Sequence, residues 1–506
     1  MHQPVKEVFS VLREHKPMMP DITNNSLSLS PDQVVVTNQS SYWIDLLSQT
    51  AQQRKATAAA SKSLNAAEVE ELARAVFSEI APKARNNGVD LYARENELVL
   101  RLIGELSGLG QLLELIASND VEDIAINMGH IYAYRTREGW KYMGPASANI
   151  ASGIRVLIDR AGQRAPTPDY PIADAMLQVM VPGPDGNVIR KGVRVNFIMQ
   201  PACPYGEIIT LRVASYRKPG AILQGESLSV LCERRLPPVT RPNFHAINLP
   251  LGSGVLTPQA ANYLLSIMVH GGTLIISGAT GSGKTFIAQR ILQEMLTYFE
   301  PGAIRLFVVE DSNEIVLNGW DGSTATNTGN IVYTVTRPEI KGGPPAITTY
   351  DLIRAALRSR PHGVVIGEAR GAEAWELIRA AATGHGHSSF TIHATGAEHV
   401  WPRFLQVVRS HPDASLLGDF QIAQSFAEAV TAVIHVERHV KHGQIVREIA
   451  EVYPVVEQVA ARPAFNFLFK FDPEKNILLS TGNRPARAGF RAHELGLPDS
   501  YFERGK

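Results

Sequence analysis

Cysteine is almost absent from this chain: Cys203 and Cys232 are the two examples among 506 residues. Two thiols are too few for a disulfide framework or a four-thiolate zinc site, so both are expected to be small buried hydrophobic side chains. No apolar run approaches the roughly 18 residues that cross a bilayer. Acidic and polar residues also interrupt the start of the chain, where a secretory signal needs an apolar core. These absences predict a cytoplasmic protein.

An excess of charge of one sign is also missing. The chain has 49 Lys plus Arg and 49 Asp plus Glu, a formal net charge of +0. Because a polyanion such as DNA is usually bound through a basic excess, the balance predicts no stable nucleic-acid binding, although it leaves a local basic patch open. The apolar content of 44% and charged content of 19% are typical of globular proteins. At about 150 residues per domain, the length predicts about three domains.

Composition divides the chain into four segments. Residues 1–64 are rich in Ser, Thr, Asn and Gln, which predicts a weakly ordered N-terminal extension. Residues 65–218 carry helical patterns followed by strand patterns and are expected to form an α+β domain. Five prolines among polar residues predict a linker over 219–254. Strand and helix patterns then alternate over 255–506, which predicts a parallel sheet with helices on its faces.

Several elements can be placed within these domains. Asn65 and Glu68 have capping-box spacing before a helical apolar face, and Thr257 with Pro258 predicts the start of a helix in the second domain. The 318–349 stretch is rich in Gly, Thr and Asn and is interpreted as a loop or hairpin outside the core. The expected strands are 124–127, 131–134, 140–142, 192–199, 207–213, 273–277, 304–309, 364–366, 432–436 and 446–452.

Residues 278–285 carry the strongest motif. Two glycines are separated by four residues and followed by Lys and Thr, between a strand pattern and a helix pattern, which is the P-loop arrangement. Its backbone N–H groups would face phosphate oxygens, Lys284 would meet the β- and γ-phosphates, and the Thr285 hydroxyl would ligate Mg²⁺. A glycine-rich turn without a ligand is the alternative, which the strand, loop and helix context disfavours. The nucleotide-binding residues predicted here are Gly278, Ala279, Thr280, Gly281, Ser282, Gly283, Lys284 and Thr285.

Three polar clusters downstream could complete a hydrolytic site, which needs a metal, an oriented water and positive charge. Residues 310–314 are acidic and follow a strand. Residues 364–370 are a buried-strand pattern ending at Glu368, placed like a Walker B carboxylate, with a structural pair to Arg370 as its alternative. The third cluster contains His385, His387 and His393. Zinc would want further ligands at short spacing, so phosphate sensing fits this cluster better.

Together with the P-loop, these motifs resemble the secretion-superfamily traffic ATPases, the hexameric motors of type II secretion, type IV secretion and type IV pili. The family's Asp box resembles 309–314, its Walker B region resembles 357–361 leading into 367–370, and its His box resembles 383–394. In the N-terminal domain, 121–127 resembles the family's opening strand. The resemblance covers most of the chain from Glu105 to Tyr453.

This resemblance implies an α/β fold, with a RecA-like P-loop NTPase C-terminal domain and a smaller α+β N-terminal domain, and it implies ATP and Mg²⁺ as ligands. Glu314 would be the general base that orients the attacking water. Glu368 would be the Walker B carboxylate and would share the metal with Thr285. His385 and His393 would couple the phosphate state to domain movement, with His385 contacting the nucleotide.

Two arginines complete the expected site. Arg194 and Arg212 resemble the family's arginine fingers, which reach the nucleotide from the N-terminal domain. A strand-surface ion pair is their alternative. The sequence departs from the family at His362, where an Asp is frequent, and it lacks the four-cysteine zinc module. That absence, together with the run from Gly384 to His387, favours the conjugative type IV secretion and tight-adherence pilus branch.

The implied protein is a cytoplasmic homohexameric ATPase, peripheral at the inner membrane, that acts on a platform or secretion-channel protein. Two alternatives stay open. A nucleic-acid motor, either a helicase or a DNA-packaging ATPase, would need a basic strip with aromatic residues. A nucleotide-gated scaffold would bind ATP with little hydrolysis.

Overall fold

The computed structural model describes residues 42–55, 66–107, 109, 112–118, 120–136, 138–147, 150–182, 188–213, 255–317, 330–439, 443–457 and 461–505. The chain divides between Leu106 and Ser107 into two compact units. The predicted linker at 219–254, Cys232 and Asn65 lie outside the described residues. Residues 42–55, which composition placed in a weakly ordered extension, form a helix.

The first unit is helical. Its core is formed by Val76, Phe77 and Ile80, which were predicted to share a helical face, together with Leu98 and Leu102. All five are at most 3% exposed, so the 3.6-residue spacing of the apolar side chains accounts for the packing. Besides 42–55, the elements are α2 (Ala66–Asn86), η2 (Tyr92–Arg94) and α3 (Glu95–Ser107).

The second unit begins with a six-stranded antiparallel sheet in the order β3-β2-β1-β6-β5-β4. The sequence correctly predicted strands at five of its positions and missed β4, whose Ala, Met and Gln residues have little preference for strands. Pairing with β5 from Ile172↔Ile198 to Pro182↔Val188 forms that strand. The elements are α4 (Leu112–Ala117), β1 (Val121–Asn127), β2 (His130–Arg135), β3 (Gly139–Pro145), α5 (Ile150–Arg160), β4 (Ile172–Pro182), β5 (Val188–Ile198) and β6 (Ile208–Val213).

The second sheet of this unit has nine strands in the order β15-β14-β13-β12-β7-β11-β10-β8-β9. Strands β12 through β9 are parallel to one another, as predicted, and β13, β14 and β15 add an antiparallel extension. The strands are β7 (Thr273–Gly278), β8 (Leu306–Glu310), β9 (Ile331–Val335), β10 (Gly363–Ile366), β11 (Ser388–Ile392), β12 (Ala432–His439), β13 (Gly443–Glu457), β14 (Arg462–Asp472) and β15 (Ile477–Ser480).

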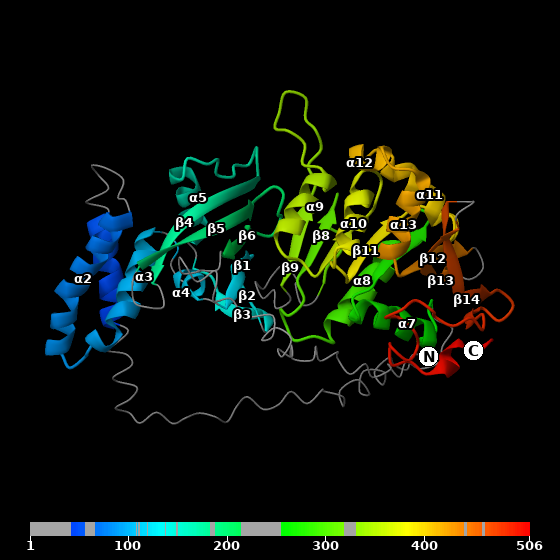
Figure 1. Ribbon diagram of the computed structural model, residues 1–506, viewed down its shortest axis with the longest axis horizontal. Helices are drawn as coiled ribbons and strands as arrows, with labels where there is room; N and C mark the ends of the chain where they lie inside the picture. Colours follow the sequence, from blue (N-terminus) through cyan, green and yellow to red (C-terminus); the bar gives the residue numbers. More distant parts are fainter. Residues whose placement is uncertain are drawn as a thin grey trace, which may run out of the picture. The chain divides into compact units, whose positions relative to one another are not determined.

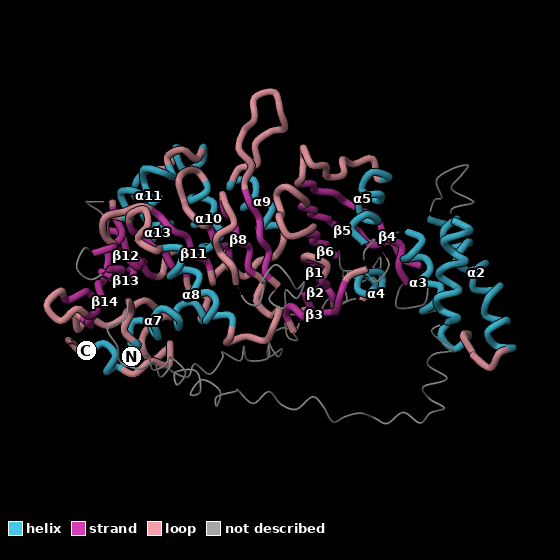
Figure 2. Tube along the Cα trace, turned by 180° about the vertical axis from the view of Figure 1, so that it is seen from behind, coloured by secondary structure: helices cyan, strands magenta, loops and turns pink. Residues whose placement is uncertain are grey.

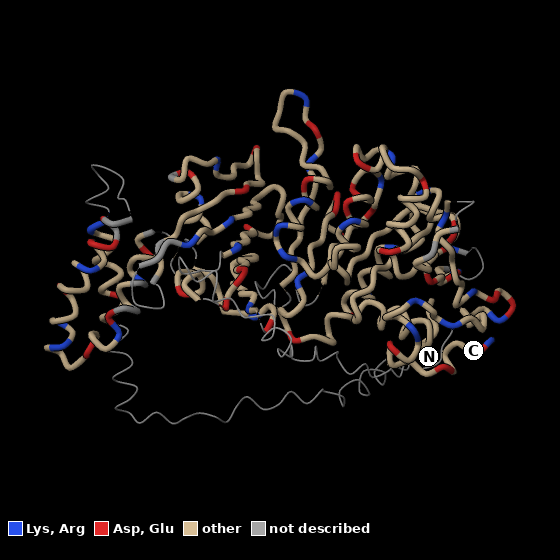
Figure 3. The backbone as a smooth tube through the Cα atoms, viewed as in Figure 1, with Lys and Arg blue, Asp and Glu red and all other residues tan. Residues whose placement is uncertain are grey.

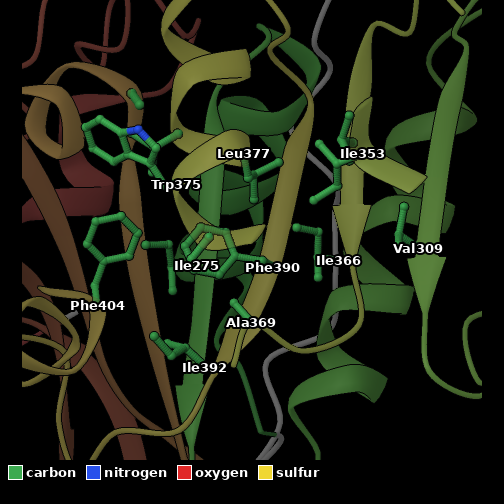
Figure 4. Close-up of a cluster of buried hydrophobic side chains, with 14 of the residues drawn as sticks. Ile275, Val309, Ile353, Ile366, Ala369, Trp375, Leu377, Phe390, Ile392 and Phe404 are labelled. Atoms are coloured by element: carbon green, nitrogen blue, oxygen red, sulfur yellow. The ribbon is translucent and has the colours of Figure 1, made fainter. Parts of the chain in front are cut away.

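Helices cover both faces of this sheet (Figures 1 and 2). The alternation along β7 shows why: Ile275 packs with the core beneath α9, α10, α11 and α13, whereas Leu274 and Ile276 pack with the core beneath α7 and α8. Figure 4 shows Ile275 and Phe390 within the first of these cores. The helices are α7 (Pro258–Val269), α8 (Lys284–Leu296), α9 (Thr349–Arg358), α10 (Glu373–Ala382), α11 (Val400–Val408), α12 (Pro412–Ser415), α13 (Asp419–Ala429) and η4 (Asp499–Phe502).

One local prediction was wrong, and one parallel strand of this sheet was not predicted. The 318–349 stretch was expected to lie outside the core, but Ile331–Val335 forms β9, a buried parallel partner of β8. Residues 388–392, for which no strand was predicted, form β11 in the middle of the sheet. Thr257 occupies the N-cap of α7 before Pro258, as predicted, although its hydroxyl makes no capping hydrogen bond. In β9 and β11, pairing with neighbouring buried strands overrides the weak strand preference of the local sequence.

Charge is mixed along the described residues: Figure 3 shows Lys and Arg interspersed with Asp and Glu rather than gathered in one region. Among the helices in the described ranges, none is long and apolar enough to cross a membrane. Cys203 is buried, as predicted.

Candidate functional site

A cleft of about 390 Å³ lies at the carboxyl ends of β7, β8, β10 and β11. Because these strands are parallel and adjacent, the segments that follow them meet at one edge of the sheet, where open α/β sheets bind ligands. Four segments line the cleft: 280–285 after β7, 310–314 at the end of β8, 367–370 after β10 and 391–393 at the end of β11. These are the predicted P-loop, Asp box, Walker B region and His box.

The P-loop joins β7 to α8 with a backbone that only glycine permits at two of its positions. A Cβ at Gly278 would lie 2.2 Å from the carbonyl oxygen of Val436, and Gly283 has a φ of 89°. The Lys284 ammonium donates to the carbonyl oxygen of Ala279 at 2.9 Å. Burial lowers the pKa of Lys284. Of the eight predicted residues, those that line the cleft are Thr280, Gly281, Gly283, Lys284 and Thr285.

Glu368 is the centre of an ion-pair cluster on the opposite wall. Its carboxylate accepts from Arg370 at 2.8 Å and lies 3.0 Å from His393 Nε2. The hydrogen bond from Arg370 is the main reason that the pKa of Glu368 is lowered. Arg370 also contacts Asp311 at 3.1 Å, so one guanidinium connects the Walker B region with the Asp box. The predicted pair of Glu368 and Arg370 is therefore present inside the cleft.

His393 lies between two hydrogen-bond acceptors. Its Nδ1 is 3.1 Å from the carbonyl oxygen of Gly278 in the P-loop, and its Nε2 faces Glu368. Both bonds are satisfied at once when both ring nitrogens carry a proton. The ring also connects the P-loop with the Walker B carboxylate, as a residue that senses the phosphate state would need to do.

Glu314 is exposed in the cleft wall, on a segment that is fixed at both ends. At one end the Glu310 carboxylate, 5% exposed, accepts the backbone N–H groups of Glu314 and Ile315. At the other end the backbone N–H of Leu317 donates to the Tyr333 hydroxyl at 2.9 Å. Burial raises the pKa of Glu310 to about 7, against the effect of the two N–H donors.

His385 does not line the cleft. It precedes β11, whereas His393 follows it, so the two histidines lie at opposite edges of the parallel sheet. His385 Nδ1 is 2.8 Å from the carbonyl oxygen of Pro361. The predicted contact of His385 with the nucleotide is not seen in the cleft, because the five residues of β11 separate His385 from the edge of the sheet at which the P-loop lies.

Arg194 and Arg212 also lie away from the residues that line the cleft. They are directly opposite each other on β5 and β6, and Asp123 lies opposite Arg212 on β1. Arg212 Nε donates to Asp123 at 3.0 Å, and Arg360, from the segment after α9, donates to the same carboxylate at 2.6 Å. The predicted alternative, an ion pair on the strand surface, is present for Arg212. Two like charges facing each other across strands cost stability, and the Asp123 carboxylate offsets the charge of Arg212.

The sequence placed Glu310 and Asp311 in the Asp box and Thr391 in the His box without giving any of them a role of its own, and all three line the cleft. The signal for Glu310 was its position as the last residue of a buried strand, one step before the exposed part of the Asp box. Its burial could not be derived from the motif.

The oxygen donors in the cleft suit a hard cation. Thr285 offers a hydroxyl and Glu368 a carboxylate, both from residues that line the cleft, and Mg²⁺ prefers such ligands together with water and phosphate oxygens. In the described ranges no group of three or more His, Cys, Asp and Glu residues is placed to hold a metal ion by itself.

Comparison with known proteins is consistent with this geometry. Residues 243–455 match the family described as Type II/IV secretion system protein. The chain is 26% identical over 342 residues to the type IV secretion system protein PtlH homolog of Bordetella bronchiseptica, covering 65% of this chain and 88% of that protein. It is 25% identical over 339 residues to the type IV secretion system protein VirB11 of Brucella suis, covering 66% of this chain and 85% of that protein.

A solved structure has a similar fold. The VirB11 ATPase from the Brucella suis type IV secretion system, crystallised in complex with sulphate, matches with a TM-score of 0.50 at 22% identity, covering 67% of this chain and 92% of that one. These findings confirm the resemblance to proteins of the secretion superfamily and the RecA-like fold with a smaller α+β N-terminal domain.

Proposed function

We propose that this ATPase powers pilus assembly or transport through a type IV secretion machine, with hydrolysis in the cleft that joins the P-loop, the Asp box, the Walker B region and the His box. One observation carries the proposal: Lys284, Thr285, Glu314, Glu368 and His393 all line the same cleft, although they come from four separate segments. A set assembled from four strand ends is what phosphoryl transfer needs, because its catalysis is mostly positioning and electrostatics.

Each residue has a role in the proposed reaction. Lys284 and the P-loop N–H groups bind the β- and γ-phosphates. Thr285 and Glu368 would hold Mg²⁺, which neutralises phosphate charge when bound. Glu314 accepts a proton from a water whose oxygen attacks the γ-phosphorus, and the bond from that phosphorus to the ADP oxygen breaks. His393 lies where it would respond to loss of the γ-phosphate.

The proposed assembly is a cytoplasmic homohexamer, peripheral at the inner membrane, acting on a platform or channel protein. Arg194 and Arg212 would act as arginine fingers after movement of the N-terminal sheet. In this structure Arg212 is held by Asp123, which it shares with Arg360. The finger role therefore requires that this arrangement can open, and opening would couple nucleotide state to the shape of the ring.

Replacement of Glu314 by Gln tests the role of the base. We expect kcat for ATP hydrolysis to fall by roughly 10²-fold to 10⁴-fold, the contribution of a general base, while binding of a fluorescent ATP analogue is retained. Glu300→Gln is the matched control, because the Glu300 side chain is 78% exposed and pairs with Lys141. Unchanged turnover in Glu314→Gln, with ATP still bound, would remove Glu314 from the mechanism.

The same assay separates the alternatives. A nucleotide-gated scaffold would bind ATP with negligible turnover in the unmodified protein. A nucleic-acid motor would show turnover stimulated by DNA, for which the mixed charge along the described residues offers no support.

A further inference from the structure

The Asp box contains two glutamates in different environments. Glu314 is exposed in the cleft, whereas Glu310, four residues earlier, is 5% exposed at the end of β8. A buried carboxylate is costly unless hydrogen bonds compensate it. Its partners show what it does in the fold.

Those partners are two consecutive backbone N–H groups. The Glu314 N–H lies 3.3 Å from both Glu310 carboxylate oxygens, and the Ile315 N–H lies 3.1 Å and 3.2 Å from them. Bonds from N–H groups to a charged acceptor are stronger than neutral ones. The carboxylate therefore fixes the backbone from which the Glu314 side chain emerges.

The segment that follows β10 leaves space for the Glu310 side chain. A Cβ at Gly367, next to the Walker B carboxylate, would lie 3.1 Å from Glu310 Cγ and 3.4 Å from Oε1. The residues after Glu314 are also held. Ile315 and Leu317 are fully buried, and Gln293 of α8 donates to the carbonyl oxygen of Val316 at 2.8 Å. The residues on either side of the exposed turn are thus held in place.

We propose that Glu310 is a positioning residue, whose carboxylate holds the backbone of Glu314 so that the side chain of Glu314 is directed into the cleft. This inference rests on the proposed function, since it assigns to Glu310 the geometry of the base named there. It acts through Glu314 and touches neither ATP nor water. Loss of the anchor lowers the rate of the chemical step and leaves nucleotide affinity in place.

Two variants test the contact between the Glu310 carboxylate and the backbone of Glu314, one by changing the carboxylate and one by displacing it. Glu310→Gln keeps the shape and one acceptor oxygen, and Gly367→Ala displaces the carboxylate without changing it. For both we expect kcat to fall between tenfold and about 10²-fold, the scale on which a displacement of about 1 Å costs rate, with the KM for ATP within about twofold. In a Glu314→Gln background neither change lowers kcat further, because residues that act as a unit are not additive. Glu300→Gln is the control in both backgrounds.

Hydrogen exchange gives a readout independent of activity. The backbone amides of Glu314 and Ile315 should exchange at least about tenfold faster in Glu310→Gln than in the unmodified protein. Unchanged exchange, unchanged kcat, or a full additional loss in the Glu314→Gln background would overturn the assignment. Faster exchange in a protein that hydrolyses no ATP would instead contradict the proposed function and leave the anchor established. If Glu310→Gln fails to fold, the same kinetic criteria applied to Gly367→Ala decide.

Discussion

At the scale of single residues, the site is defined by differences between similar side chains. Glu310, Glu314 and Glu368 are three carboxylates in one cleft, yet the first is buried, the second is exposed and the third is paired with Arg370. Motif spacing predicted which acids meet there, because the ends of parallel strands are brought together by the fold. It could not predict their burial, which depends on residues from other segments, such as Gly367, whose lack of a side chain leaves room for Glu310.

Burial of Glu310 predicts a specific dependence of stability on pH. Its pKa is raised from 4.5 to about 7, so between these values the folded protein holds a proton that the unfolded chain releases. The stabilisation is fully present below pH 4.5 and is lost as the pH rises through about 7, a difference of about 3 kcal/mol. Nearby Tyr205 has its own pKa raised by burial and by Glu310, and it stays neutral in this range.

Urea unfolding of the unmodified protein and of Glu310→Gln between acid and neutral pH measures this effect. Because Gln does not titrate, the difference in unfolding free energy between the two proteins should shift by about 3 kcal/mol against the unmodified protein as the pH rises. A difference that does not change with pH would contradict the raised pKa.

At the scale of elements, Asp123 of the six-stranded sheet is bonded to the segment that follows α9 in the P-loop domain. The Asp123 side chain is 0% exposed and accepts from Arg212 of β6 and from Arg360 after α9. Arg360 also contacts Glu122 at 2.6 Å and lies over the Tyr134 ring at 3.5 Å. Removing this carboxylate takes a charged hydrogen-bond acceptor from both guanidinium groups, although Arg360 keeps its contact with Glu122.

Asp123→Asn should therefore lower the free energy of unfolding by on the order of 2 kcal/mol, the scale of a hydrogen bond to a charged group. Asp499→Asn is the matched control, since Asp499 pairs with Arg484 and its side chain is 63% exposed; it should cost under about 1 kcal/mol. Urea unfolding measures both. Equal small losses in the two variants would show that the Asp123 contact is no stronger than an ordinary surface pair.

Local sequence patterns were insufficient to predict two of the parallel strands of the nine-stranded sheet. Strand patterns predicted β7, β8 and β10, but β9 and β11 were missed because their flanking Gly, Thr, Asn and Ser residues resemble loops. Both strands are held by parallel neighbours on the sheet, a contact between residues far apart in sequence. The positions of Arg194 and Arg212 away from the cleft could not be predicted for the same reason, because they depend on how the two sheets of this unit contact each other.

At the scale of the whole molecule, the proposed function requires a ring. Sizing the protein with and without a non-hydrolysable ATP analogue should show a species of about six chains in at least one condition. The expected reason is that phosphate charge in the cleft draws in the arginine fingers and closes contacts between subunits. A strict monomer in both conditions would count heavily against the assembly, while leaving the cleft chemistry intact.

The central claim is that the cleft hydrolyses ATP with the residues assembled there. Its most direct test is phosphate release by the unmodified protein with ATP and Mg²⁺, measured beside Lys284→Ala. We expect the unmodified protein to release phosphate steadily, on the order of 1 s⁻¹ or faster once it is assembled. We expect this turnover to be lost in Lys284→Ala, because the variant lacks the ammonium group that meets the phosphates. Absence of turnover in the unmodified protein, or equal turnover in both, would contradict the claim.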